Sequence, residues 1–186
     1  MRIISGELKG RKIIFPEIKN TRPLRDYVKE SIFNIIENSN KLKFKIKDSK
    51  ILDLFSGSGS FGFECISRGA ENVIFFENYP YTLKILKKNI DQLKISKKCE
   101  VFNQDSFNLL SKKEILVKKF DLIFIDPPYR ERKINLLIEN ILKKEILNEN
   151  GIIIVHRHKN DDIDITKKLE ILDIRLYGIS KIFIGC

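Results

Sequence analysis

The sequence predicts an α/β fold with a mostly parallel seven-stranded sheet that ends in an antiparallel edge hairpin. Short apolar runs alternate with helical patterns from residue 50 onward, which is typical of a parallel sheet covered by helices on both faces. The last two runs have no helical pattern between them, so we expect them to form the hairpin. The chain has 186 residues, of which 42% are hydrophobic, and this suffices for one domain with a buried core.

Residues 1–48 predict a small basic extension in front of a core that spans residues 49–186. The extension begins with two apolar runs within residues 1–15, which flank GELKG and its two glycines and predict a hairpin. Residues 16–23 predict a loop. A helical pattern begins at Asp26, and a polar, basic connector follows it.

The core elements then follow in alternation. Strands are predicted for KILDLF, NVIFFE, CEVFN, FDLIFI and GIIIVH, at residues 50–55, 72–77, 99–103, 120–125 and 151–156. Helical patterns separate them at residues 61–68, 81–93, 107–116 and 133–147. The two strands of the edge hairpin are expected at residues 169–178 and 180–186.

The charge of the chain favours a polyanionic partner such as nucleic acid. The sequence holds 35 basic and 25 acidic residues, a net charge of +10. Lysine is abundant throughout, so a general compositional bias is the alternative explanation. Residues 1–48 hold twelve basic and six acidic side chains, so over half of the excess charge is in the first quarter of the chain.

The cysteines and the hydropathy pattern argue against several classes of protein. Cys65, Cys99 and Cys186 are scattered without a C-x-x-C pair, so neither a zinc site nor a disulfide framework is expected. There is no long apolar segment and no signal peptide pattern. These observations predict a cytoplasmic protein with reduced thiols and no membrane association.

A glycine-rich loop, DLFSGSGSFG at residues 53–62, separates the first core strand from the first core helix. Its glycines follow the G-x-G-x-x-G spacing, which lets the backbone approach a ligand closely. Glu77 ends the next strand, where a carboxylate can accept the hydroxyls of a ribose. A nicotinamide dinucleotide and S-adenosylmethionine both remain open as ligands. Asp53 favours the second, because it can bind an ammonium and would repel a pyrophosphate.

Asp105 follows the third core strand in the stretch NQDSF. Its carboxylate can accept a hydrogen bond from the amino group of an adenine. It can equally cap the helix that is predicted to begin near Phe107. The two roles are compatible.

The fourth core strand ends in the sequence DPPY, residues 126–129. Asp126 and the carbonyl of Pro127 can each accept one hydrogen of a nucleobase amino group, which would aim its lone pair at the methyl group of a cofactor. Pro127 and Pro128 stiffen this corner, and Tyr129 offers a ring on which a flipped base can stack. The alternative is a simple strand terminator. The cofactor loop upstream favours methyl transfer to an amino group.

These motifs resemble the class I S-adenosylmethionine-dependent methyltransferases, whose fold is Rossmann-like. The first stretches, RIISGELKGRKIIFP and TRPLRDYVKESIFNII, narrow the resemblance to the RsmD family, which methylates guanine N2 in 16S ribosomal RNA. The resemblance covers nearly the whole chain, and its early part is the more specific.

The resemblance implies a role for each matching position. The catalytic corner would comprise Asp126, Pro127, Pro128 and Tyr129. The cofactor would be held at its methionine end by Asp53, Ser56, Gly57 and Gly59, at its ribose by Glu77 and at its adenine by Asp105. In RNA binding, Arg11 and Lys12 would contact phosphates, and Arg22 and Arg25 would lie near the cofactor's lid and the RNA entrance. No metal is implied.

The chain departs from its relatives after the fifth strand. Relatives tend to carry a glutamate there, often followed by histidine, whereas this chain reads VHRHK. His156 and His158 are two residues apart on a strand and share a face. No third ligand is near in the sequence, so surface or packing roles are expected rather than metal binding.

RNA is the expected substrate rather than DNA, since the chain has no room for a separate DNA-recognition domain. The expected partner is 16S ribosomal RNA within an assembled or assembling small ribosomal subunit. Two alternatives remain open at this stage: an adenine-N6 methyltransferase acting on RNA or DNA, and an RNA-binding assembly factor without turnover. No apolar seam demands a dimer, so a monomer is the default expectation.

Overall fold

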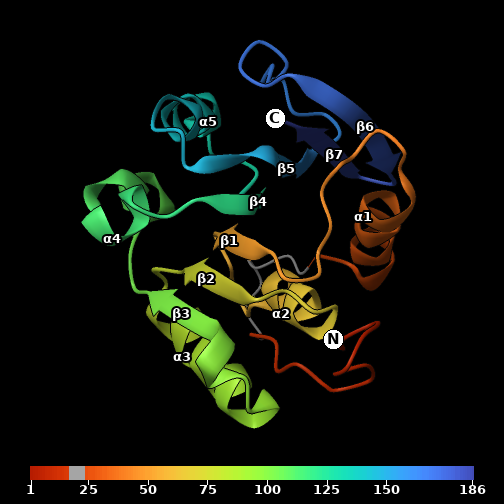
Figure 1. The fold of residues 1–186 in the computed structure, drawn as a ribbon, viewed down its shortest axis with the longest axis vertical. Coiled ribbons are helices and arrows are strands. Elements are labelled where there is room, and N and C mark those ends of the chain that lie inside the picture. The colour runs from red at the N-terminus through yellow and green to blue at the C-terminus, as the bar shows by residue number, and fades with distance from the viewer. Residues whose placement is uncertain (17–23) are drawn as a thin grey trace.

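A seven-stranded sheet forms the centre of the molecule, with helices on both of its faces (Figure 1). The computed structural model describes residues 1–16 and 24–186. The strand order is β3-β2-β1-β4-β5-β7-β6. Pairing is parallel from β3 to β5 and antiparallel where β7 joins β5 and β6. The predicted fold class, including the C-terminal edge hairpin, is therefore confirmed.

The strands lie close to the predicted runs. Their bounds are β1 Lys50–Leu54, β2 Asn72–Phe76, β3 Cys99–Phe102, β4 Phe120–Ile125, β5 Leu147–His158, β6 Ile171–Tyr177 and β7 Ser180–Gly185. Most residues of the central strands are buried on both faces, which explains why they read as continuous apolar runs.

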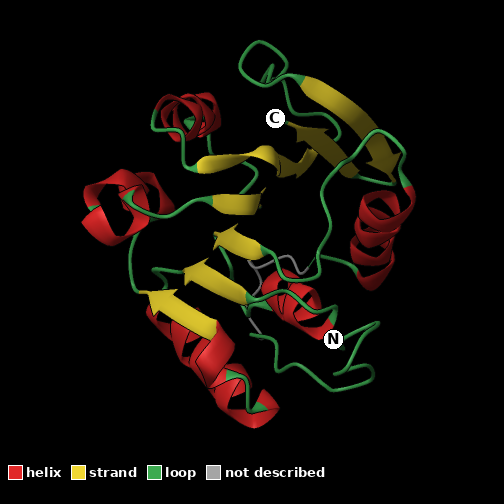
Figure 2. Ribbon diagram, in the orientation of Figure 1, coloured by secondary structure: helices red, strands yellow, loops and turns green. Residues whose placement is uncertain are grey.

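The helices divide between the two faces of the sheet (Figure 2). Their bounds are α1 Asp26–Asn38, α2 Ser60–Ser67, α3 Pro80–Leu93, α4 Lys113–Leu116 and α5 Ile134–Lys143, with 3-10 turns η1 Ser96–Lys98 and η2 Ser106–Ser111. Helices α1, α2 and α3 pack on one face, and α4 and α5 on the other. In the described part of the chain, no helix combines the length and apolar character that a membrane span requires.

The boundary between α5 and β5 differs from the prediction. The helix ends at Lys143, so the expected continuation to residue 147 was wrong. Leu147 instead begins β5 and pairs with Phe120, after which the register shifts and Leu122 pairs with Ile152. The polar stretch between these two pairs conceals the start of the strand from a periodicity argument.

The N-terminal segment forms the predicted hairpin in a minimal form, with a single bridge between its arms in place of two regular strands. One isolated antiparallel bridge joins Arg2 to Lys12, supported by a 3.0 Å hydrogen bond from the Ile3 amide to the Arg11 carbonyl. Other amides of the segment donate to core side chains instead. The Leu8 amide donates to Ser67 Oγ at 2.9 Å. The amides that do not pair across the hairpin thus find their acceptors on α2.

Glu64 on α2 is the main anchor of this segment. Its fully buried carboxylate accepts hydrogen bonds from the amides of Ile4 and Ser5, at 2.7 and 2.9 Å. Arg68 Nε donates to it at 3.0 Å, and the Nζ of the equally buried Lys29 lies 3.6 Å away. Two cations and two amides therefore compensate the buried charge of one glutamate.

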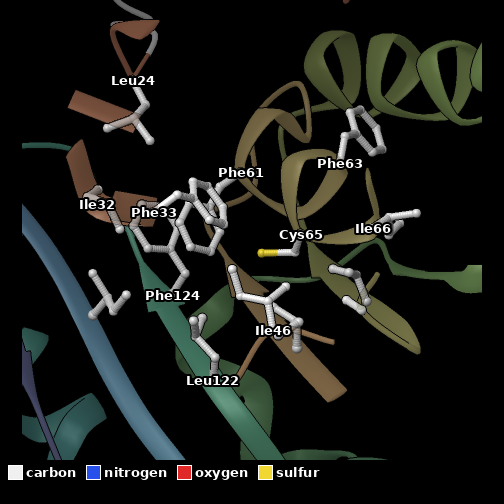
Figure 3. Packing of buried hydrophobic residues seen from close by; sticks show 14 of the residues in the cluster. Leu24, Ile32, Phe33, Ile46, Phe61, Phe63, Cys65, Ile66, Leu122 and Phe124 are labelled. Atoms are coloured by element: carbon white, nitrogen blue, oxygen red, sulfur yellow. The ribbon is translucent and has the colours of Figure 1, made fainter. Parts of the chain in front are cut away.

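Three stacked rings connect α1, α2 and the sheet (Figure 3). The ring centroids of Phe33 and Phe61 are 5.1 Å apart, and those of Phe61 and Phe124 are 3.8 Å apart. Gly62 lets α2 approach the sheet closely, since a Cβ there would lie 2.3 Å from Cε1 of Phe75. This packing holds the loop before α2 at the carboxyl ends of β1 and β4.

Candidate active site

A cavity of about 730 Å³ opens at the carboxyl ends of β1, β2 and β4. Nine of the residues predicted from the sequence line it: Asp53, Ser56, Gly57, Glu77, Asp105, Asp126, Pro127, Pro128 and Tyr129. The strand order explains this convergence, because β1 lies between β2 and β4 and parallel strands end at the same edge. The sheet thus brings two motifs together that are more than 60 residues apart in the sequence.

The loop between β1 and α2 makes a tight, strained turn. Phe55 and Gly57 adopt positive φ angles of 59° and 56°, and Gly59 does so at 87°. For the phenylalanine this backbone conformation is costly, and such strain is concentrated at functional sites. A Cβ on Gly57 would meet open space, whereas one on Gly59 would lie 2.5 Å from the Phe63 ring. Gly59 therefore serves the packing of α2, and Gly57 faces the cavity.

Asp53 is a buried carboxylate at the base of the cavity. Its side chain accepts a 3.1 Å hydrogen bond from the Gly62 amide, and the residue is 1% exposed. Burial raises the pKa of Asp53 well above its usual range, and the negative charges of Asp126 and Glu77 raise it further. Three carboxylates therefore oppose one another around the cavity. A positively charged group would relieve this repulsion, while a pyrophosphate would increase it.

Glu77, directly after β2, closes the other side of the glycine loop. Its two carboxylate oxygens accept hydrogen bonds from the amides of Gly57 and Tyr79, at 2.8 and 2.7 Å. Burial raises the pKa of Glu77, and these amide hydrogen bonds partly oppose that effect. Each oxygen keeps a further lone pair, so the carboxylate can also accept two hydroxyl groups.

Asp105 caps the 3-10 turn η2. Its side chain accepts a 2.9 Å hydrogen bond from the Phe107 amide, which confirms the predicted capping role. The adjacent Ser106 accepts a 3.0 Å hydrogen bond from the amide of the strained Phe55. Asp105 lines the cavity as well, and its predicted contact with an adenine remains a prediction.

The DPPY corner is held against β1. The Asp126 amide donates to the Leu54 carbonyl, at 3.4 Å, and 22% of the Asp126 side chain is exposed. Pro127 is buried, Pro128 is exposed and Tyr129 is half-buried. Asp126 is thus fixed by the sheet while its carboxylate still reaches the cavity.

His156, at the end of β5, contacts this corner directly. It is 5% exposed, its Nδ1 lies 2.8 Å from Asp126 Oδ1, and its Nε2 lies 2.9 Å from Ser180 Oγ. Burial alone would lower the pKa of His156, but the charge and hydrogen bond of Asp126 outweigh it, so the pKa is raised. The prediction of a surface or packing role missed this contact. The pairing of Ile125 with Val155 could have suggested it, since the next residues are then neighbours.

Arg157 holds the backbone of the same corner from the other face of β5. Its guanidinium is 1% exposed and donates to the carbonyls of Pro128, Tyr129 and Glu131, at 3.3, 3.0 and 3.0 Å. It also forms an ion pair with Asp161. Nothing in the local sequence pattern indicated this role.

Three of the four predicted RNA-binding residues can be placed, and none of these three lines the cavity. Arg11, Lys12 and Arg25 are exposed, and Arg11 Nη2 donates to the Gln92 carbonyl at 3.1 Å. Arg22 lies outside the described residues. His158 packs against Tyr129, with ring centroids 5.2 Å apart. Within residues 1–16 and 24–186, no group of three or more His, Cys, Asp or Glu side chains could hold a metal ion.

Known proteins share this sequence pattern and this fold. The family model for conserved hypothetical protein 95 matches residues 1–185. Ribosomal RNA small subunit methyltransferase D of Haemophilus influenzae is 36% identical, over 96% of this chain and 90% of that protein. The protein of the same name from Buchnera aphidicola is also 36% identical, over 89% and 82%.

Solved structures agree with these relatives. The structure of yhhF from Escherichia coli superposes with a TM-score of 0.82 at 26% identity, over 99% of this chain and 96% of that one. The structure of HI0767 from Haemophilus influenzae gives a TM-score of 0.76 at 32% identity, over 98% and 96%. The similarity thus includes the N-terminal extension as well as the sheet.

Proposed function

Because the chain belongs to the RsmD family, described as conserved hypothetical protein 95, we propose that it methylates the N2 amino group of a guanine in 16S ribosomal RNA. S-adenosylmethionine would supply the methyl group. The observation that carries the proposal is the carboxylate-lined cavity with Asp126, Pro127 and Pro128 at its edge. The relatives named ribosomal RNA small subunit methyltransferase D support the choice of RNA.

The residues around the cavity fit S-adenosylmethionine better than a dinucleotide. Asp53 would hold the ammonium of its methionine end, and Ser56, Gly57 and Gly59 would form the loop around that end. Glu77 has lone pairs left for the two ribose hydroxyls, and Asp105 would accept from the adenine amino group. A bound sulfonium supplies an activated methyl group, so the protein need only present the acceptor nitrogen.

The DPPY corner would present that nitrogen. Asp126 and the Pro127 carbonyl accept the two amino hydrogens, which draws the nitrogen lone pair out of conjugation with the base. The corner is held in place by β1 and by Arg157 before any substrate binds, and this is electrostatic preorganisation. Tyr129 offers its ring to the base, which must leave its stack to reach the site.

The proposal is tested by identifying the methylated nucleoside. Small ribosomal subunits from cells that lack the gene are incubated with the protein and tritiated S-adenosylmethionine, beside naked 16S RNA and duplex DNA. We expect label in N2-methylguanosine from the subunits. Label in N6-methyladenosine would overturn the substrate, and bound cofactor without any label would point to an assembly factor instead.

The exposed arginines of the extension are proposed to bind RNA phosphates. Replacing Arg11 or Arg25 by alanine should reduce the slope of log affinity against log salt concentration by about one for each phosphate that the variant no longer neutralises. The affinity for S-adenosylhomocysteine should stay unchanged, since neither side chain lines the cavity. Filter binding at several salt concentrations measures the slope, and calorimetry measures the cofactor affinity.

Lys167→Ala is the matched control for these variants, because Lys167 is exposed but lies in the C-terminal part of the chain. It should leave the salt slope unchanged. An equal loss of RNA and cofactor binding in the Arg11 and Arg25 variants would refute the division of labour between extension and cavity.

A further inference from the structure

Asp126 has a protein partner on one of its two oxygens. Oδ1 lies 2.8 Å from Nδ1 of His156, which comes from the neighbouring strand β5. Asp126 is 22% exposed and His156 is 7% exposed at the side chain, so the pair joins the cavity to the protein interior. If Oδ1 is engaged by His156, Oδ2 remains as the oxygen that can accept from a substrate.

The Asp126 carboxylate favours a proton on Nδ1 of His156, because an ionised carboxylate can only accept, and Ser180 on β7 is compatible with that arrangement. Its hydroxyl lies 2.9 Å from Nε2 of His156, and both residues are buried. A hydroxyl can donate or accept by rotation. When the imidazole is neutral, Ser180 can donate to Nε2, so the ring proton stays on Nδ1 and faces Asp126. When it is protonated, Nε2 donates to Ser180 and Nδ1 still donates to Asp126.

We propose that His156 is a positioning residue for the methyl-transfer reaction: it holds Asp126 Oδ1 through its Nδ1–H and thereby directs Oδ2 toward the substrate amino group. This inference rests on the proposed function of the cavity. The proposal links three side chains by hydrogen bonds: Asp126 after β4, His156 on β5 and Ser180 on β7.

The reaction step balances around this arrangement. The amino nitrogen forms a bond to the methyl carbon as the carbon–sulfur bond breaks, with its electron pair left on sulfur. The nitrogen then carries one proton too many. That N–H bond breaks, its electron pair returns to nitrogen, and the proton passes to Asp126 Oδ2 and from there to solvent. His156 keeps its own proton throughout and fixes the accepting carboxylate.

Several charged groups surround His156 and influence its protonation. Asp126 faces it from the end of β4 and Arg157 is its neighbour on β5. The Tyr129 ring stands edge-on at 6.0 Å between centroids, and Asp53 and Arg130 line the same cavity. Because Asp126 raises the pKa of His156, the ion pair stabilises the fold below the ordinary histidine pKa. That contribution is lost as the pH rises through the raised value.

The pair can be tested by NMR without any substrate. The chain has two histidines, so His158→Gln leaves the His156 signals alone in the imidazole spectrum. In that background, with Asp126 intact, the nitrogen chemical shifts should place the proton of the neutral imidazole on Nδ1. Adding Asp126→Asn should lower the pKa of His156. An unchanged pKa in the Asp126→Asn variant would overturn the proposed pair, whether or not the protein methylates RNA.

The positioning role is tested by turnover. His156→Leu removes the donor and should lower kcat by about 10- to 100-fold, the range seen for residues that orient metal ligands through a hydrogen bond. The KM for S-adenosylmethionine should not change. His156→Asn keeps an N–H donor near the position of Nδ1 and should restore most of the rate. Asp121→Asn, near the other end of β4, is the control and should change kcat by less than about threefold.

The outcomes separate this inference from the proposed function. Equal rates for His156→Leu and the wild type would overturn the positioning role. A rate loss that His156→Asn does not reduce would also overturn it, since a general packing defect would then explain the loss. If the wild type methylates no RNA while Asp126→Asn still lowers the pKa of His156, the hydrogen-bonded pair is supported and the proposed function fails.

Discussion

Replacing Asp126 by alanine is expected to lower turnover by about 100- to 10,000-fold while cofactor binding changes little. The reason is a separation of tasks within the cavity. Asp126 lies in the DPPY corner, whereas Asp53 and Glu77 surround the glycine loop and keep their own amide hydrogen bonds. Single-turnover methyl transfer measures the first quantity, and calorimetric titration with S-adenosylhomocysteine measures the second.

Asp121→Asn is the matched control for this variant. Asp121 belongs to the same strand as the corner but lies near its other end, where it accepts from the Lys50 amide at 2.8 Å. Its replacement should leave turnover unchanged. If Asp126→Ala keeps a rate near that of the wild type, the proposed presentation of the amino group by the corner is incorrect.

Replacing Arg157 by alanine is expected to lower the free energy of unfolding by about 3–5 kcal/mol. Asp161 would lose its buried ionic partner, and the carbonyls of Pro128, Tyr129 and Glu131 would lose their donor. Arg157→Lys should recover only part of this stability, because an ammonium cannot span three carbonyls as a planar guanidinium does. Urea unfolding followed by circular dichroism measures the difference.

Arg132→Ala provides the comparison for Arg157. Arg132 also pairs with an aspartate, Asp162, but both side chains are largely exposed, at 72% and 68%. Exposed pairs of this kind contribute about 0–1 kcal/mol. If Arg157→Ala destabilises the protein no more than Arg132→Ala does, the guanidinium does not hold the corner.

The sheet and the two principal motifs could be predicted from the sequence because their signals are local. Strands such as β1 and β4 are buried on both faces and read as apolar runs, and the glycine loop and DPPY each occupy consecutive residues. Parallel order then places both motifs at one edge. The prediction failed where a local segment is governed by distant partners.

Three places illustrate that limit. The amides of Ile4 and Ser5 bind Glu64 about 60 residues away, and no local pattern in the sequence indicates this anchor. His156 and Arg157 bind a corner about 30 residues before them, and only the register of β4 with β5 brings them there. Periodicity describes which face a side chain occupies, and it does not describe which partner lies on that face.

The anchoring of the N-terminal extension on Glu64 has a consequence for how the protein unfolds. The extension carries the predicted RNA-binding side chains, yet its amides and Lys29 compensate a carboxylate at the centre of α2. Detaching the extension would remove these two amides and the Lys29 ammonium from Glu64, and of the partners named above only Arg68 would remain. We therefore expect the extension and the core to unfold as one cooperative unit, even though their proposed tasks are separate.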